Sequence, residues 1–232
     1  MLLACALGCG PASFAQVPPA KVDASAPIPK RANPAFYAAH AEFLKRSKEP
    51  MDLLFIGDSI TAGWAKAPAI WSKYYGQWRP ANFGIGGDQT HHVIWRIEDG
   101  ELDGVKPKVA VLMLGTNNTG AHNAAEIVAA NTKIVRMIQQ KIPGVKVLLL
   151  AIFPRGPRVA NTGIPDAWEK RMEIINAANV ELAKLDDGSS VRFLNINEKF
   201  LDADGKIPAD VMPDQLHPNE KGYQIWADAM HP

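Results

Sequence analysis

Short apolar runs alternate with longer segments of helical periodicity, and this alternation limits the folds open to the chain. Runs typical of buried strands cover 53–56, 81–85, 109–114, 145–153 and 191–196. The segments 124–141, 166–185 and 220–230 carry apolar residues at helical spacing. Strands that alternate with helices predict a parallel sheet covered on both faces. We therefore expect an α/β fold, a doubly wound three-layer sandwich with a flavodoxin-like, five-stranded parallel sheet in the order 2-1-3-4-5.

The chain before this pattern divides into two short segments. Residues 1–15 are apolar, hold both cysteines of the chain and end in small residues, which predicts a signal peptide or, around Cys5, a lipoprotein signal. Residues 16–34 are rich in proline and alanine and predict an extended linker without a core of its own. Residues 35–232 then form one domain, long enough to bury a large core without disulfides. We expect an exported protein, periplasmic or extracellular, either free or lipid-anchored.

Charge and motif spacing narrow the classes of function. The chain has 25 Lys and Arg against 24 Asp and Glu, without a basic run, which gives no support to nucleic-acid binding or to an anionic membrane surface. No group of His, Cys and Asp has metal-ligand spacing. The glycines of 84–87 lack the G-x-G-x-x-G pattern of a dinucleotide site. We expect no cofactor, no metal, no nucleic-acid partner and no integral membrane segment in the mature chain.

Four polar blocks follow predicted strands or lie in nearby loops. They are Gly57-Asp58-Ser59, Gly84-Ile85-Gly86-Gly87-Asp88, Gly115-Thr116-Asn117-Asn118 and Asp214-Gln215-Leu216-His217. Each block alone has an ordinary explanation as a turn or as a surface ion pair. In open α/β sheets ligands bind beyond the carboxyl ends of the strands, so we expect the four blocks to converge there.

A serine, a histidine and a carboxylate in these blocks provide the parts of a nucleophilic hydrolase. Ser59 becomes an effective nucleophile only when a base takes its proton, and His217, oriented by Asp214, is the candidate base. The backbone N–H groups of Ser59 and Gly87 and the side-chain amide of Asn117 are candidate donors to an oxyanion. Together these residues predict hydrolysis of an ester through an acyl-enzyme.

A second pair of residues has the same spacing. Asp88 and His91 are three residues apart, as are Asp214 and His217. In this alternative Asp88 would orient His91. Pairing at the C-terminus instead leaves Asp88 free to brace the loop that contains the glycines of 84–87, which we call the glycine loop. Spacing by itself does not choose between the two pairs.

The four blocks resemble those of the SGNH, or GDSL, hydrolase superfamily, over about residues 50–226. The middle of the chain further resembles the catalytic subunits of intracellular platelet-activating factor acetylhydrolase. The segments that carry this second resemblance are 82–88, 92–96, 100–102, 107–108, 115–118 and 154–156. The resemblance implies the SGNH hydrolase fold and, by analogy alone, a homodimer.

The resemblance also implies roles for individual residues. It implies Ser59 as nucleophile, His217 as base and Asp214 as the residue that orients it. Ser59, Gly87 and Asn117 then donate to the oxyanion, and the pair Asp88 and His91 has no catalytic role. For the substrate pocket we predict contributions from Asp58, Trp64, Arg155 and Trp168, and we interpret His40, His122 and His231 as surface residues.

The export signal and the linker are not expected of an intracellular acetylhydrolase. We therefore predict a serine esterase that removes short acyl groups, with acetyl first, from carbohydrate or small-alcohol esters, as many exported members of the superfamily do. The alternative is a lysophospholipase or acetylhydrolase acting on lipid esters. A third hypothesis, of another class, is a carbohydrate-binding relative without turnover.

Overall fold

The structure is a computed structural model that describes residues 21–158 and 166–231. The predicted signal segment 1–15 and residues 16–20 of the predicted linker lie outside these ranges. The strands are β1 (Leu53–Gly57), β2 (Pro80–Gly84), β3 (Val109–Met113), β4 (Lys146–Leu150) and β5 (Val191–Leu194). All neighbours in the sheet are parallel, in the order β2-β1-β3-β4-β5, which confirms the predicted fold class and strand order.

The helices fall between these strands. The α-helices are α1 (Pro34–Arg46), α2 (Ser59–Ala62), α3 (Pro68–Tyr75), α4 (Thr90–Glu98), α5 (Ala124–Lys141), α6 (Trp168–Leu182) and α7 (Glu220–Met230). Short 3-10 helices cover Gly63–Lys66, Gly76–Trp78, Thr116–Gly120, Ala183–Leu185 and Asn197–Phe200. The helices predicted at 124–141 and 220–230 have the expected bounds. The one predicted at 166–185 begins at Trp168 and tightens to a 3-10 turn after Leu182.

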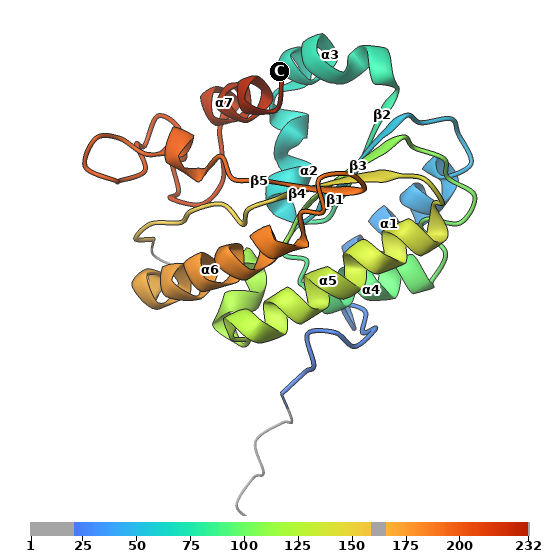
Figure 1. Cartoon of the computed structure of the whole chain (residues 1–232), viewed down its shortest axis with the longest axis horizontal. Helices are drawn as coiled ribbons and strands as arrows, with labels where there is room; N and C mark the ends of the chain where they lie inside the picture. Colours follow the sequence, from blue (N-terminus) through green and yellow to red (C-terminus); the bar gives the residue numbers. More distant parts are fainter. Residues whose placement is uncertain (1–20, 159–165, 232) are drawn as a thin grey trace, which may run out of the picture.

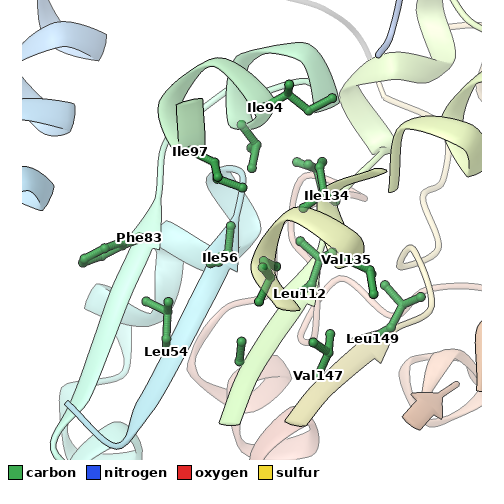
Figure 2. Close-up of a cluster of buried hydrophobic side chains, with 14 of the residues drawn as sticks. Leu54, Ile56, Phe83, Ile94, Ile97, Leu112, Ile134, Val135, Val147 and Leu149 are labelled. Atoms are coloured by element: carbon green, nitrogen blue, oxygen red, sulfur yellow. The ribbon is translucent and has the colours of Figure 1, made fainter. Parts of the chain in front are cut away.

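Alternate residues of each strand divide the core into two layers. Leu54 and Ile56 of β1 point to the face covered by α4, α5 and α6, whereas Leu53 and Phe55 point to the face covered by α2, α3 and α7. Figure 1 shows the sheet between these two sets of helices. Figure 2 shows side chains of the first layer, with Ile94 and Ile97 of α4 and Ile134 of α5 above the strands. Helices therefore shield both faces of the sheet from solvent, which explains the continuous apolar runs of its strands.

The described part of the predicted linker, residues 21–33, lies against the domain. Ala24 is 1% exposed, and its carbonyl accepts a hydrogen bond from Thr90 Oγ1 at 2.8 Å. Lys21 forms an ion pair with Glu126 at 2.6 Å. The segment contains no helix or strand and is attached to the helical face that carries α4 and α5. Proline-rich composition gave no sign of these attachments.

The helix that follows this segment begins as its sequence predicts. The Asn33 side chain accepts a hydrogen bond from the Phe36 backbone N–H at 3.0 Å, and Pro34 occupies the first helical position. Phe43 stacks on Phe83 of β2 with ring centroids 4.6 Å apart. This helix, α1, therefore closes the core beside the β2 edge of the sheet.

Candidate active site

The Gly-Asp-Ser block lies where β1 ends and α2 begins. A Cβ atom on Gly57 would lie 2.5 Å from the backbone oxygen of Met113 in β3 and would also clash with Thr61, so only glycine fits there. Asp58 caps α2, because its side chain accepts a hydrogen bond from the Ile60 N–H at 2.9 Å. Ser59 is the first residue of α2 and stays partly exposed at the carboxyl edge of the sheet.

A chain of two hydrogen bonds joins Ser59 to the C-terminal block. Ser59 Oγ lies 2.8 Å from Nε2 of His217, and His217 Nδ1 lies 2.7 Å from Oδ2 of Asp214. An ionised carboxylate only accepts, so Nδ1 carries the proton and Nε2 is left to accept the hydroxyl proton of Ser59. The structure thus brings together the three side chains that the sequence analysis combined.

The turn that carries His217 is held mainly by Asp214. Its Oδ1 accepts the backbone N–H groups of His217 at 2.7 Å and of Leu216 at 3.2 Å. Partial burial opposes ionisation of this carboxyl, but the hydrogen bonds from His217 and the charge of Arg158 lower its pKa below the usual value. Asp214 is therefore an anion at neutral pH, in the state that fixes the imidazole tautomer.

The glycine loop after β2 and the block after β3 follow the two strands that flank β1, so they lie at the same edge of the sheet as Ser59. Gly87 has φ of +71°, a conformation that favours glycine. Asn117 Nδ2 donates to the backbone oxygen of Asp88 at 2.9 Å and lies 3.4 Å from Oδ2 of Asp58. Within residues 21–158 and 166–231, the backbone N–H groups of Ser59 and Gly87 donate no hydrogen bond to the protein. These two donors are thus free to bind an oxygen atom from a ligand.

The alternative pair, Asp88 and His91, is not a pair in the structure. Asp88 is fully buried and contacts Lys30 at 2.7 Å and Arg96 Nε at 3.1 Å. His91 is 6% exposed, and burial and the neighbouring His122 lower its pKa to about 4. As predicted for the case in which Asp88 is not a catalytic orienter, its carboxylate braces the glycine loop.

Two of the predicted pocket residues lie inside the protein. Trp64 is 2% exposed and packs on Tyr223 and Trp226, with ring centroids 4.7 and 5.1 Å away. Asp58 has no exposed surface, and burial together with the charge of Asp88 raises its pKa to about 7. Both predictions of a pocket residue are wrong, because Trp64 fills the core below α2 and Asp58 holds the helix N-terminus.

The other two predicted pocket residues flank residues 159–165, which lie outside the described ranges. Arg155 is 6% exposed, forms an ion pair with Asp166 and donates to Thr116 Oγ1 at 3.3 Å. It supports the block after β3 from below rather than presenting its guanidinium to solvent, which corrects the prediction. Trp168 is partly exposed at the start of α6, and its place in the pocket stays a prediction.

Two histidines interpreted as surface residues are buried. His40 is 3% exposed and lies 2.9 Å from Asp99 and 3.4 Å from Glu101, and these carboxylates raise its pKa against the opposing effect of burial. His122 is also 3% exposed, with Nε2 2.8 Å from the backbone oxygen of Val22. His231 is exposed, as expected. A lone histidine in sequence gave no sign of these partners.

A buried ionic network extends from the glycine loop to α4, and only its member Asp88 was given a role from the sequence. Lys30, Asp88, Arg96 and Glu101 are linked in that order, and Asp88, Arg96 and Glu101 have no exposed surface. The segments 92–96 and 100–102 carried part of the family resemblance, which was a signal that these positions matter. Nothing in the proline-rich segment pointed to Lys30.

The described residues hold no group of three or more His, Cys, Asp or Glu side chains arranged to bind a metal ion. None of the helices in the described ranges is both long enough and apolar enough to cross a bilayer.

Comparison with known proteins places these features in a family. Residues 55–225 match the model of the GDSL-like Lipase/Acylhydrolase family. Platelet-activating factor acetylhydrolase IB subunit alpha2 of Rattus norvegicus is 37% identical over 188 residues, which cover 80% of this chain and 76% of the relative.

Solved structures share the fold at lower sequence identity. A putative platelet activating factor structure from Streptococcus pneumonia superimposes with a TM-score of 0.68 at 22% identity and covers 84% of this chain and 90% of its own. An acetyl xylan esterase, AlAXEase, gives a TM-score of 0.58 at 21% identity and covers 77% and 96%. At these identities the likeness establishes the architecture only.

Proposed function

The chain belongs to the GDSL-like lipase/acylhydrolase family and is a carboxylic ester hydrolase, and we propose that it removes acetyl or other short acyl groups through an acyl-enzyme on Ser59. The observation that carries this proposal is the contact of Ser59 Oγ with His217 Nε2 at 2.8 Å, continued to Asp214 at 2.7 Å. This arrangement is that of a nucleophile, its general base and the residue that orients the base.

The reaction follows from the positions of these atoms. Ser59 Oγ bonds to the ester carbonyl carbon while its proton passes to His217 Nε2, and Asp214 stabilises the imidazolium that forms. The imidazolium then gives that proton to the leaving alkoxide as the carbon–oxygen bond breaks. Water repeats the sequence on the acyl-enzyme and releases the carboxylic acid and free Ser59.

The negative charge of the tetrahedral intermediate develops on the former carbonyl oxygen, which needs hydrogen-bond donors around it. The backbone N–H groups of Ser59 and Gly87 have no partner within the described protein, and Asn117 Nδ2 lies beside them on the Asp88 carbonyl. We assign these three groups to the oxyanion, where losing one donor typically lowers turnover by about 10²–10³-fold.

Two of the similar proteins are named for the acetyl group. The curated relative is named an acetylhydrolase and a structural neighbour an acetyl xylan esterase, so two names with different alcohols share the acetyl group. We prefer carbohydrate or small-alcohol esters because two polar side chains, Arg158 and Gln215, are neighbours of Asp214. The 37% identity to the acetylhydrolase favours a second candidate, acetylated lipid esters.

A chain-length series of p-nitrophenyl esters tests the acyl group. We expect the highest kcat/KM for acetate and a steady decline with longer chains, and a preference for chains of eight or more carbons would rule out an acetylesterase. Acetate release from acetylated xylan, acetylated chitin fragments and an acetylated lysolipid then separates the two alcohol classes. Ser59→Ala is the control, since activity that survives it would come from another mechanism.

We also propose export and, by analogy with the resembling subunits, a homodimer. Export is supported only by the apolar, small-residue pattern of residues 1–15. Fractionation of expressing cells, with mass analysis of the mature N-terminus, tests cleavage and lipidation. Sedimentation of the purified chain tests the dimer.

A further inference from the structure

The Lys30 side chain reaches the glycine loop from the segment before α1. Its Nζ donates to the backbone oxygen of Gly86 at 2.6 Å and pairs with Asp88 Oδ1 at 2.7 Å. A Cβ atom on Gly87, between these two residues, would lie 3.8 Å from the same nitrogen. The side chain is 12% exposed and also lies over the ring of Phe36, 5.4 Å from its centroid. One ammonium group therefore holds both ends of the loop 86–88.

The contact with Gly86 acts on the donor of the next residue. The Gly86 carbonyl and the Gly87 N–H belong to one planar trans peptide, in which the two groups point in opposite directions. A donor that fixes the carbonyl therefore fixes the direction of the N–H. A positive charge on the oxygen also polarises the peptide and strengthens its N–H as a donor. Glycine has the least intrinsic preference for one backbone conformation, so an outside restraint is needed here.

We propose that Lys30 is a positioning residue for ester hydrolysis, which aims the Gly87 N–H at the oxyanion and holds the loop that carries it. The proposal rests on the function proposed above for Ser59 and Gly87. It extends to a second donor, because the backbone oxygen of Asp88 accepts Asn117 Nδ2 at 2.9 Å. Through Gly86 and Asp88, Lys30 thus connects two of the three oxyanion donors.

The surrounding contacts favour this role over a purely structural one. Asp88 keeps a buried partner without Lys30, because Arg96 Nε holds the other carboxylate oxygen at 3.1 Å. The segment is also tied down elsewhere, by Lys21 on Glu126 and by the Ala24 carbonyl on Thr90. Loss of the ammonium is therefore expected to loosen the loop while the segment stays in place. Lys30 itself lies outside the family match at 55–225.

Steady-state kinetics of Lys30→Met with p-nitrophenyl acetate test the role. We expect kcat to fall by about 10–100-fold and KM to change by less than about threefold, since the lost interaction acts in the transition state. Lys30→Arg keeps a cation within reach of the loop and should recover part of the loss. Lys21→Met is the matched control, because it removes an ion pair of the same segment that does not touch the loop, and it should leave kcat unchanged.

Inhibition by a trifluoromethyl ketone distinguishes a positioning role of Lys30 from a purely structural one, because a structural role would leave the inhibition constant unchanged. This inhibitor forms a tetrahedral adduct with an oxyanion, so in Lys30→Met its inhibition constant should rise by the same factor by which kcat/KM falls. Unchanged inhibition, or kcat equal to that of the unaltered enzyme, would overturn the role of Lys30. If the unaltered enzyme shows no Ser59-dependent hydrolysis, the proposed function itself fails. If the unaltered enzyme is active and Lys30→Met is equally active, the role of Lys30 is wrong and the proposed function stands.

Discussion

The chain has two Asp-x-x-His segments, one at the start of α4 and one just before α7, and their environments are opposite. Asp214 and His217 occupy an exposed turn before α7, where the carboxylate accepts both the imidazole and two backbone N–H groups. Asp88 and His91 lie at the start of α4. There the Asp88 carboxylate forms ion pairs with Lys30 and Arg96, and the His91 imidazole is buried without a contact to that carboxylate. The spacing is identical, but the backbone between the residues decides whether the side chains meet.

The two segments differ in whether their histidine can act as a general base for Ser59. A base for Ser59 must be reachable by its hydroxyl and must keep a carboxylate on its far nitrogen, and the turn at 214–217 allows both. At the start of α4, Asp88 forms ion pairs with two cations, and its carboxylate accepts no hydrogen bond from His91. Four experiments, ordered from the largest expected effect to the smallest, test this contrast.

The largest expected difference is between substitutions of the two histidines. His217→Ala should lower kcat by roughly 10⁴–10⁶-fold, because it removes the base for Ser59. His91→Gln should leave kcat within about threefold, since His91 touches neither Ser59 nor the oxyanion donors. Single-substrate kinetics on p-nitrophenyl acetate measure both. A rate loss that follows His91 instead would show that the wrong pair was chosen.

Substitution of the two aspartates should affect different properties, catalysis for Asp214 and stability for Asp88. Asp214→Asn should lower kcat by roughly 10³–10⁴-fold without changing the fold, because it disturbs the imidazole tautomer in an exposed turn. Asp88→Asn should lower the free energy of unfolding by about 3–5 kcal/mol, because it breaks a buried ionic network. Kinetics and urea unfolding of both variants distinguish these effects. Equal losses of stability would contradict the contrast.

The buried histidine should make folding sensitive to acid. The pKa of His91 is about 4 in the folded chain and about 6.5 when unfolded, so the unfolded state binds more protons between these values. Its stabilising contribution is complete above pH 6.5 and is lost as pH falls toward 4, by about 3 kcal/mol at most. Urea unfolding of the parent and of His91→Gln across this range measures the difference.

His92 gives a dependence of the same sign in both proteins, since burial and His91 lower its pKa to about 3. The difference between the two stability curves therefore reports His91 together with its effect on the pKa of His92. Parallel curves over the whole range would mean that folding does not lower the pKa of His91.

The smallest expected effect concerns the cation next to Asp214. Arg158 Nη2 lies 3.3 Å from Asp214 Oδ2 at the surface, whereas the cations of Asp88 are buried. Exposed ion pairs contribute about 0–1 kcal/mol, so Arg158→Met should change kcat/KM by less than about fivefold. A larger loss, measured on the same ester, would mean that Arg158 contacts the substrate.

The sequence was most informative where a local pattern fixes a local outcome. The helix at 124–141 and the order of the strands depend on neighbouring residues and on the handedness of crossovers, so they were predicted. The convergence of Ser59, Asn117 and Gly87 at one edge followed from the same parallel sheet. These features need no knowledge of which distant side chains meet.

The errors share one cause. Trp64, Asp58, Arg155, His40 and His122 were placed at the surface or in a pocket, and the structure buries them. Polar or amphipathic residue types are usually exposed, and their burial depends on partners far away in the chain, such as Glu101 for His40. One sequence does not show which partner will be present.

The sequence by itself determined the sheet, its order and the residue types of a serine hydrolase at the carboxyl edge, because periodicity and strand ends are local properties. The family resemblance implied that the segment 214–217 reaches Ser59, but only the folded structure shows that contact and the support of the glycine loop. Both depend on distances between residues such as Ser59 and His217, 158 positions apart, or Lys30 and Gly86, 56 positions apart. Only the folded chain brings such residues within hydrogen-bond distance.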